Sequence, residues 1–141
     1  MSDSYQDFKD QLPEYVKTEA DFELYAMRHS AEHVLTEAML RIYGKDKITM
    51  AMGPATLEGF YFDFEVKEGV EINEAEFTKI EAEMEKIKQE AQPIVRKIIT
   101  NSEAKDLFKG NSYKMEWLPR LQRLNVLPQF ARQSVEYLWL N

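Results

Sequence analysis

Apolar and polar positions alternate along the chain with two different periods. Over residues 21–43 the apolar positions recur at helical spacing and fall within an arc of roughly 100° on a helical wheel, and Gly44 follows as a C-terminal stop. We therefore predict a helix over residues 21–43. Its apolar face comprises Met27, Ala31, Val34, Leu35, Ala38 and Ile42.

Residues 47–66 have the period-2 pattern of a β-hairpin. Phe60, Phe62 and Phe64 alternate with more polar neighbours, and glycine and proline interrupt the segment between its two halves. We expect two strands that share one apolar face.

A second amphipathic helix is predicted after Asn73, which can form a capping box with Glu76. Its core stripe comprises Phe77, Ile80, Met84, Ile87 and Ala91.

The C-terminal third of the chain has shorter periodic segments. They predict a strand over 93–100, a capped helix over 101–110, a strand over 112–118, an irregular stretch over 119–129 and a strand over 134–140. This mixed order predicts an α+β fold, an antiparallel sheet packed with helices. We expect residues 1–20 to be a loosely ordered lead-in and residues 21–141 to form one domain.

Composition narrows the class of protein. The sequence has no run of about 18 apolar residues and begins with a polar, acidic stretch, so we expect a cytoplasmic protein without a membrane partner. Because it has no cysteine, disulfides and thiol nucleophiles are excluded within these residues. The net charge of −7 is unusual for a nucleic-acid binder, but residues 94–141 alone carry +4.

The two histidines of the chain, His29 and His33, lie four residues apart, on the side of the first helix opposite its apolar arc. Such a pair can bind a metal, or can position a water molecule and carry its proton. It can equally consist of surface or packing histidines. A zinc site needs three or four ligands, and only carboxylates are left to complete one here.

Several motifs together resemble the editing domain of threonyl-tRNA synthetase. They are, in chain order, "RHSAEHVLTEAMLRIYG", "MGPATLEGFYFDFEV" and the long segment that begins "FTKIEAEMEKIKQEAQPIV" and ends "NSYKMEWL". The family has an H-S-x-x-H helix, a glycine- and aromatic-rich hairpin, an acidic helix and a Ser-Tyr-Lys segment in this order. The resemblance spans about residues 24–118 and implies the α+β editing fold.

The resemblance implies an activity and three site residues. The activity is hydrolysis of serine wrongly attached to threonine tRNA, with the tRNA acceptor end as partner. His29 and His33 match the pocket histidines, and Lys114 matches the pocket lysine, which would orient water or stabilise negative charge on the ester oxygen. No cofactor is expected in these residues. The zinc and ATP of the parent synthetase, an expected homodimer, would lie elsewhere.

The chain also departs from the family pattern. Phe62 stands where the family has tyrosine, and the family's Cys- and His-containing final motif is absent, so we expect a truncated domain. A metal at His29 and His33 would then need that missing segment. Two other functions stay open: a non-catalytic module that binds the tRNA acceptor end or is structural, and a free-standing deacylase of the alanyl type.

Overall fold

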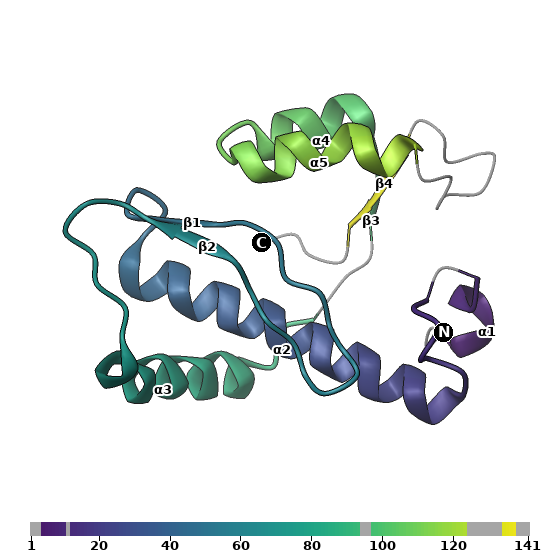
Figure 1. The fold of residues 1–141 in the computed structure, drawn as a ribbon, viewed down its shortest axis with the longest axis horizontal. Helices are drawn as coiled ribbons and strands as arrows, with labels where there is room; N and C mark the ends of the chain where they lie inside the picture. The colour runs from purple at the N-terminus through teal and green to yellow at the C-terminus, as the bar shows by residue number, and fades with distance from the viewer. Residues whose placement is uncertain (1–3, 11, 94–96, 124–133, 138–141) are drawn as a thin grey trace.

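A computed structural model of the chain describes residues 4–10, 12–93, 97–123 and 134–137, with residues 97–98, 120–123 and 134–137 described by their backbone only. The fold is α+β, as predicted. In the described part, helices predominate, and the strands form two antiparallel sheets of two strands each (Figure 1). No helix in these ranges is both long and apolar enough to cross a membrane.

The longest element is helix α2, Glu19–Tyr43, which confirms the helix predicted over 21–43. It begins at a capping box, in which the Asp21 N–H donates to Thr18 Oγ1 and the Thr18 N–H donates to the Asp21 carboxylate. It ends at Gly44, whose φ of 85° suits glycine and whose N–H donates to the Leu40 carbonyl. The helix crosses most of the length of the molecule (Figure 1).

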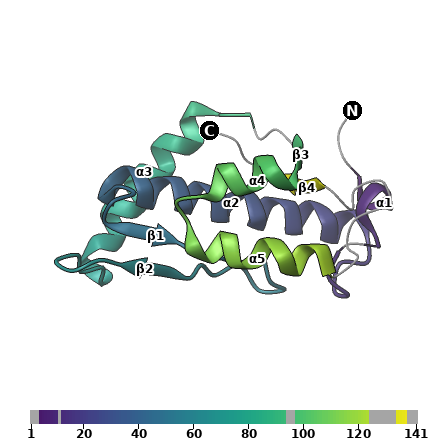
Figure 2. The same ribbon diagram turned by 90° about the horizontal axis from the view of Figure 1, so that it is seen from above.

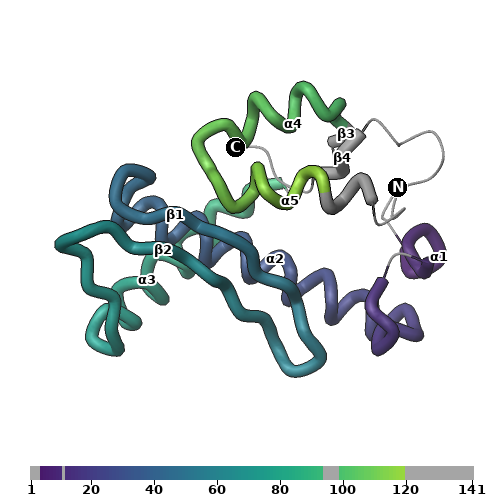
Figure 3. Tube along the Cα trace, turned by 45° about the horizontal axis from the view of Figure 1, so that its top comes forward, coloured from purple at the N-terminus to yellow at the C-terminus, as the bar shows by residue number. Residues whose placement is uncertain are grey.

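The predicted hairpin is confirmed, with short strands. β1, Ile48–Met50, pairs with β2, Phe64–Val66, in antiparallel register. The long loop between them runs along α2 toward its N-terminal half (Figure 3). Arg28 Nη1 of α2 donates to the Thr56 carbonyl at 3.1 Å and fixes the loop there.

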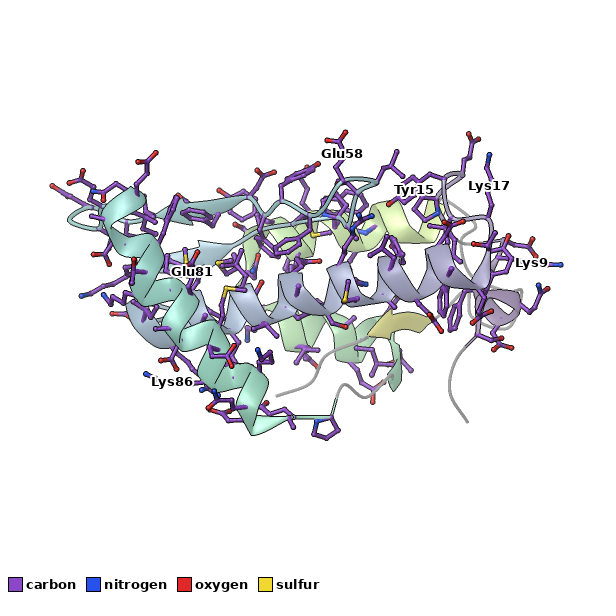
Figure 4. The ribbon with its side chains drawn as sticks, turned by 90° about the horizontal axis from the view of Figure 1, so that it is seen from below. Lys9, Tyr15, Lys17, Glu58, Glu81 and Lys86 are labelled. Carbon is purple, nitrogen blue, oxygen red and sulfur yellow. The ribbon has the colours of Figure 1, made fainter. Side chains whose placement is uncertain are left out.

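The N-terminal segment supports the same loop. Tyr15 donates its hydroxyl to the Ala55 carbonyl at 2.8 Å, and Figure 4 labels Tyr15 together with Glu58, which projects outward from the loop. Residues 1–20 also contain a short helix α1, Tyr5–Phe8, and the first residues of α2. Phe8 stacks on Phe22 of α2, with ring centroids 5.9 Å apart.

Helix α3, Glu74–Glu90, packs against the C-terminal half of α2. Asn73 caps it, but its side chain accepts from the N–H of Ala75, so the predicted capping box with Glu76 does not form. Ile80 and Ile87 are buried as predicted.

Three residues expected in the core are exposed: Phe77 at 52%, Met27 of α2 at 61%, and Ala91. Phe77 lies at the edge of its apolar stripe, Met27 lies in the N-terminal half of α2, and Ala91 is the C-cap residue of α3. The buried centre of this half comprises Met39, Ile48, Met50 and Ile80.

The C-terminal part is a second small unit. Strand β3, Lys97–Thr100, pairs antiparallel with β4, Ser134–Tyr137, and helix α4, Asn101–Phe108, follows β3 after a capping box at Thr100. These elements confirm the strands predicted over 93–100 and 134–140 and the helix over 101–110 where residues are described. Residues 94–96 and 138–140 of the predicted strands lie outside the described ranges, and Pro93 is described but does not belong to β3.

The strand predicted over 112–118 is wrong, because this segment is helix α5, Ser112–Arg123. The Lys114 N–H donates to Asn111 Oδ1, which starts a helix. Met115 and Leu118, three residues apart, then pack on the same side into a core with Ile99, Ala104 and Phe108. Residues 119–123, expected to be irregular, belong to α5, and residues 124–129 lie outside the described part.

Helices α4 and α5 lie side by side above α2 and the hairpin (Figure 2). Hydrogen bonds join the parts: Asn111 Nδ2 donates to the Met50 carbonyl at 2.7 Å, and the Tyr113 hydroxyl donates to Glu65 Oε2 at 3.0 Å. The start of α5 is therefore fixed against β1 and β2.

Candidate functional site

Helix α2 presents His29, Glu32 and His33 on one side. Residues three and four apart on a helix are neighbours, so the three side chains meet. The imidazole centroids of His29 and His33 are 4.7 Å apart, and His29 Nε2 lies 3.6 Å from Glu32 Oε2. One donor atom from each of the three residues lies within 4.8 Å of the other two.

Glu32 is the residue that the sequence analysis missed. It is only 5% exposed, and among the described residues it is the one buried charged side chain. Its Oε2 has no hydrogen-bond partner within the described part of the chain. Burial raises the pKa of Glu32 to about 7, although the positive charge of Lys114 opposes this shift. Its spacing from the two histidines was a signal in the sequence.

Lys114 reaches the same cluster from α5. The hydrogen bond from its N–H to Asn111 and the hydrogen bond from Asn111 to Met50 fix the start of this helix against β1. Burial lowers the pKa of Lys114, and the Glu32 carboxylate opposes that change. The Lys114 ammonium also lies 5.3 Å from the centroid of the Phe108 ring.

The electrostatics of the two imidazoles follow from this setting. Burial lowers the pKa of both, and for His33 the positive charges of His29 and Lys114 lower it further, to about 4. Both rings are therefore neutral at pH 7 and can accept a proton. The structure brings all three residues predicted for the site into one electrostatically coupled group, with Glu32 as a fourth member.

Tyr25 borders this group on the N-terminal side. Its ring centroid lies 6.1 Å from that of His29, and burial raises the pKa of its hydroxyl. It stays protonated at neutral pH and can serve as a hydrogen-bond donor.

An apolar cavity of about 290 Å³ lies further along α2. It contains none of the ionisable residues of the histidine cluster, and Glu81, labelled in Figure 4, is the one charged residue that lines it. The lining residues are Leu35, Met39, Met50, Phe62, Phe64, Ile72, Phe77, Ile80, Glu81 and Met84. The cavity offers apolar contact rather than acid–base chemistry.

No protein-family model matches the chain. Curated relatives do: the threonine–tRNA ligase of Thermotoga maritima is 41% identical over 95 residues, which are 67% of this chain and 15% of the relative. That of Desulfatibacillum aliphaticivorans is 39% identical over 108 residues, 77% of this chain and 16% of the relative. The threonine–tRNA ligase of Aquifex aeolicus is 35% identical over 111 residues, which are 77% of this chain and 17% of the relative.

The chain is related to one segment of threonine–tRNA ligase. This confirms the resemblance inferred from the motifs. The matched segment amounts to roughly one sixth of the length of these threonine–tRNA ligases.

Proposed function

We propose that this chain is the proofreading segment of a cytoplasmic threonine–tRNA ligase and hydrolyses the ester of serine wrongly attached to threonine tRNA. One observation carries the proposal: two neutral imidazoles, a buried carboxyl and a lysine from another helix converge in a relative of threonine–tRNA ligase. The partner would be the acceptor end of the tRNA, and the parent enzyme a homodimer.

A threonine-charging enzyme needs such a site for a physical reason. Serine differs from threonine by one methyl group, and a pocket gains only about 1–3 kcal/mol of discrimination from a methyl. A second site that removes the wrong product restores accuracy. It must accept serine and act on an ester, which is readily hydrolysed by an oriented water molecule.

The cluster supplies the groups for ester hydrolysis. A neutral imidazole, most directly that of the partly exposed His29, accepts a proton as water attacks the ester carbonyl carbon. The Lys114 ammonium would stabilise the oxyanion that forms on the carbonyl oxygen. The bond to the ribose oxygen then breaks, and that oxygen takes the proton back from the imidazolium, which releases serine and free tRNA.

Hydrolysis of seryl-tRNA by this chain tests the proposal, with threonyl-tRNA as the control substrate. We expect serine to be released faster than in buffer and faster than threonine, and His29→Ala to remove most of the difference. Release at the buffer rate would overturn the proposed activity.

A binding measurement distinguishes the non-catalytic alternative. The imidazole signals of His29 and His33 are followed by NMR while a non-hydrolysable seryl-adenosine amide is added. Shifts at both residues without any hydrolysis would favour an acceptor-end binding module. Signals that do not move at saturating analogue would overturn the assignment of the histidines to the pocket.

A further inference from the structure

We propose that Glu32 binds the α-ammonium group of an aminoacyl ester, so that the site accepts esters of free amino acids and rejects esters with a blocked amine, such as that of peptidyl-tRNA. The inference rests on the proposed function for the position of the ester. It assigns a recognition role to a residue that the proposed reaction leaves unused. Neither imidazole serves as a ligand, so His29 stays available as the base.

The charges of the cluster favour a cationic ligand at Glu32, which is its only acidic member. Both imidazoles are neutral at pH 7, and Lys114 adds a positive charge. An aminoacyl ester brings a further positive charge, because an α-amino group is protonated near neutral pH. A cation that enters a buried site is costly without a nearby anion. Glu32 is the member of this cluster that can compensate it.

Glu32 lacks the partner that a buried carboxylate normally has. It is 5% exposed, and within the described residues its Oε2 accepts no hydrogen bond. Buried carboxylates are usually held by hydrogen bonds or paired with a cation. Burial raises the pKa of Glu32 to about 7, so a proton neutralises this carboxylate over much of the neutral range. A bound ammonium would instead donate to Oε2 and keep the carboxylate ionised.

Lys114 does not act as that partner within the described part of the chain. Its positive charge acts on Glu32, but its ammonium donates no hydrogen bond to Glu32 Oε2. In the proposed reaction this ammonium stabilises the carbonyl oxygen of the ester. The complex would therefore pair each positive group with its own negative partner: Lys114 with the oxyanion, and the α-ammonium with Glu32.

The dimensions of an aminoacyl ester suit this arrangement. His29 Nε2 lies 3.6 Å from Glu32 Oε2, and the His29 side chain is 29% exposed, so an ester can approach the pair from solvent. In such an ester the amine nitrogen lies about 2.5 Å from the carbonyl carbon, since bonds of about 1.46 and 1.52 Å separate them. An ester attacked by a water molecule at His29 thus carries its ammonium close to Glu32. Rotation of the Glu32 side chain toward His29 would complete the contact.

The consequence is a selection based on the amine. Acylation of the α-amine removes its positive charge and adds bulk, so an N-acetyl or peptidyl group would leave Glu32 without a cation and would have to fit into a buried place. Replacement of the amine by a hydroxyl removes the charge and keeps the size. Together the two changes separate the effect of charge from that of size.

The test is a calorimetric titration of the full chain with two non-hydrolysable adenosine amides. One carries the seryl group, and the other carries a hydroxyl in place of the α-amine. We expect the seryl compound to bind more tightly, on the order of tenfold to a hundredfold. Glu32→Gln should make the two affinities equal, mainly by weakening the seryl compound. Equal affinities in the unaltered chain would overturn the proposal, as would a difference that Glu32→Gln leaves intact or a failure of both compounds to bind.

Glu37→Gln is the matched control, because Glu37 lies on the same helix just over one turn away and its carboxylate is engaged by Arg41. This variant should keep the difference between the two compounds. Circular dichroism checks that Glu32→Gln folds. If it does not, the comparison of the two compounds on the unaltered chain still decides, since it needs no variant.

A hydrolysis measurement separates this proposal from the proposed function. Seryl-tRNA should be hydrolysed faster than N-acetylseryl-tRNA, and Glu32→Gln should narrow the difference. A chain that binds the seryl compound through Glu32 and hydrolyses neither substrate keeps this inference and loses the proposed activity. A chain that hydrolyses both substrates at the same rate keeps the activity and loses this inference.

Discussion

The two halves of helix α2 hold glutamates in opposite environments. Near its C-terminus, Arg41 joins Glu37 on α2 to Glu83 and Glu90 on α3, with Arg41 Nη1 2.6 Å from Glu90 Oε1. Hydrogen bonds from this guanidinium lower the pKa of Glu90 to about 2. Near the N-terminus, burial raises the pKa of Glu32 to about 7.

The difference shows how a charged residue that holds the fold together differs from one that can take part in chemistry. In the Arg41 network one guanidinium contacts three carboxylates, and it holds the two helices together. The cluster of His29, Glu32, His33 and Lys114 is buried or half-buried, and within the described residues Glu32 Oε2 accepts no hydrogen bond. It can therefore change protonation state or bind a ligand, at the expense of stability.

The largest effect is expected at Lys114. If the site hydrolyses seryl-tRNA, Lys114→Met should lower the rate by a factor on the order of 10² or more, as loss of a transition-state contact does. Lys105→Met, on the exposed side of α4, is the control and should keep the full rate. A Lys114 variant with unchanged single-turnover kinetics would return this residue to a structural role.

A second prediction concerns the hairpin, which covers both halves of α2. A Cβ on Gly53 would lie 2.3 Å from the Tyr61 carbonyl oxygen, a backbone atom that cannot easily move. Gly53→Ala should lower the free energy of unfolding by about 2 kcal/mol or more, measured by urea denaturation. Gly59→Ala, which meets nothing within 4 Å, should change it little. Equal changes in the free energy of unfolding for the two variants would show that the hairpin shifts to accommodate the added Cβ at Gly53.

Local periodicity was enough to predict most of the fold. The 3.6-residue period gave α2 to within two residues of its start, and Gly44 gave its end. The strand prediction for residues 112–118 was wrong because Tyr113, Met115 and Trp117 alternate with polar residues, as they would in a strand. Their helix depends on the Asn111 cap and on the packing of Leu118 against Phe108, which are local and tertiary details that a period does not show.

The site was only partly accessible from the sequence. His29, His33 and Lys114 came from motif order, and nothing in the spacing of residues 33 and 114 indicates that they approach each other. Glu32 was missed because a glutamate on a helix is usually exposed. Lys114, whose charge acts on Glu32, is distant in the sequence.

The third prediction concerns pH, because Glu32 and Glu90 should change the stability of the protein in opposite directions as pH rises. In metal-free buffer, folded Glu32 keeps its proton up to about pH 7, whereas the unfolded chain releases it near pH 4.5, so this residue costs stability as pH rises through that window. Glu32→Gln should raise the free energy of unfolding at pH 8 by about 1–3 kcal/mol and change it little at pH 4. A destabilised variant at pH 8 would mean that Glu32 is already well paired.

The smallest effect is expected at Glu90, with the opposite dependence on pH. Its folded pKa of about 2 lies below the unfolded value, so its contribution to stability is complete above about pH 4.5 and is lost as pH falls toward 2. Glu90→Gln should lower the melting temperature slightly at pH 7 and leave it unchanged at pH 2, and 1 M salt should reduce the difference because the network is exposed. A loss of stability that persists at pH 2 would have to come from packing rather than charge, and the two halves of α2 would then differ less than their pKa values indicate.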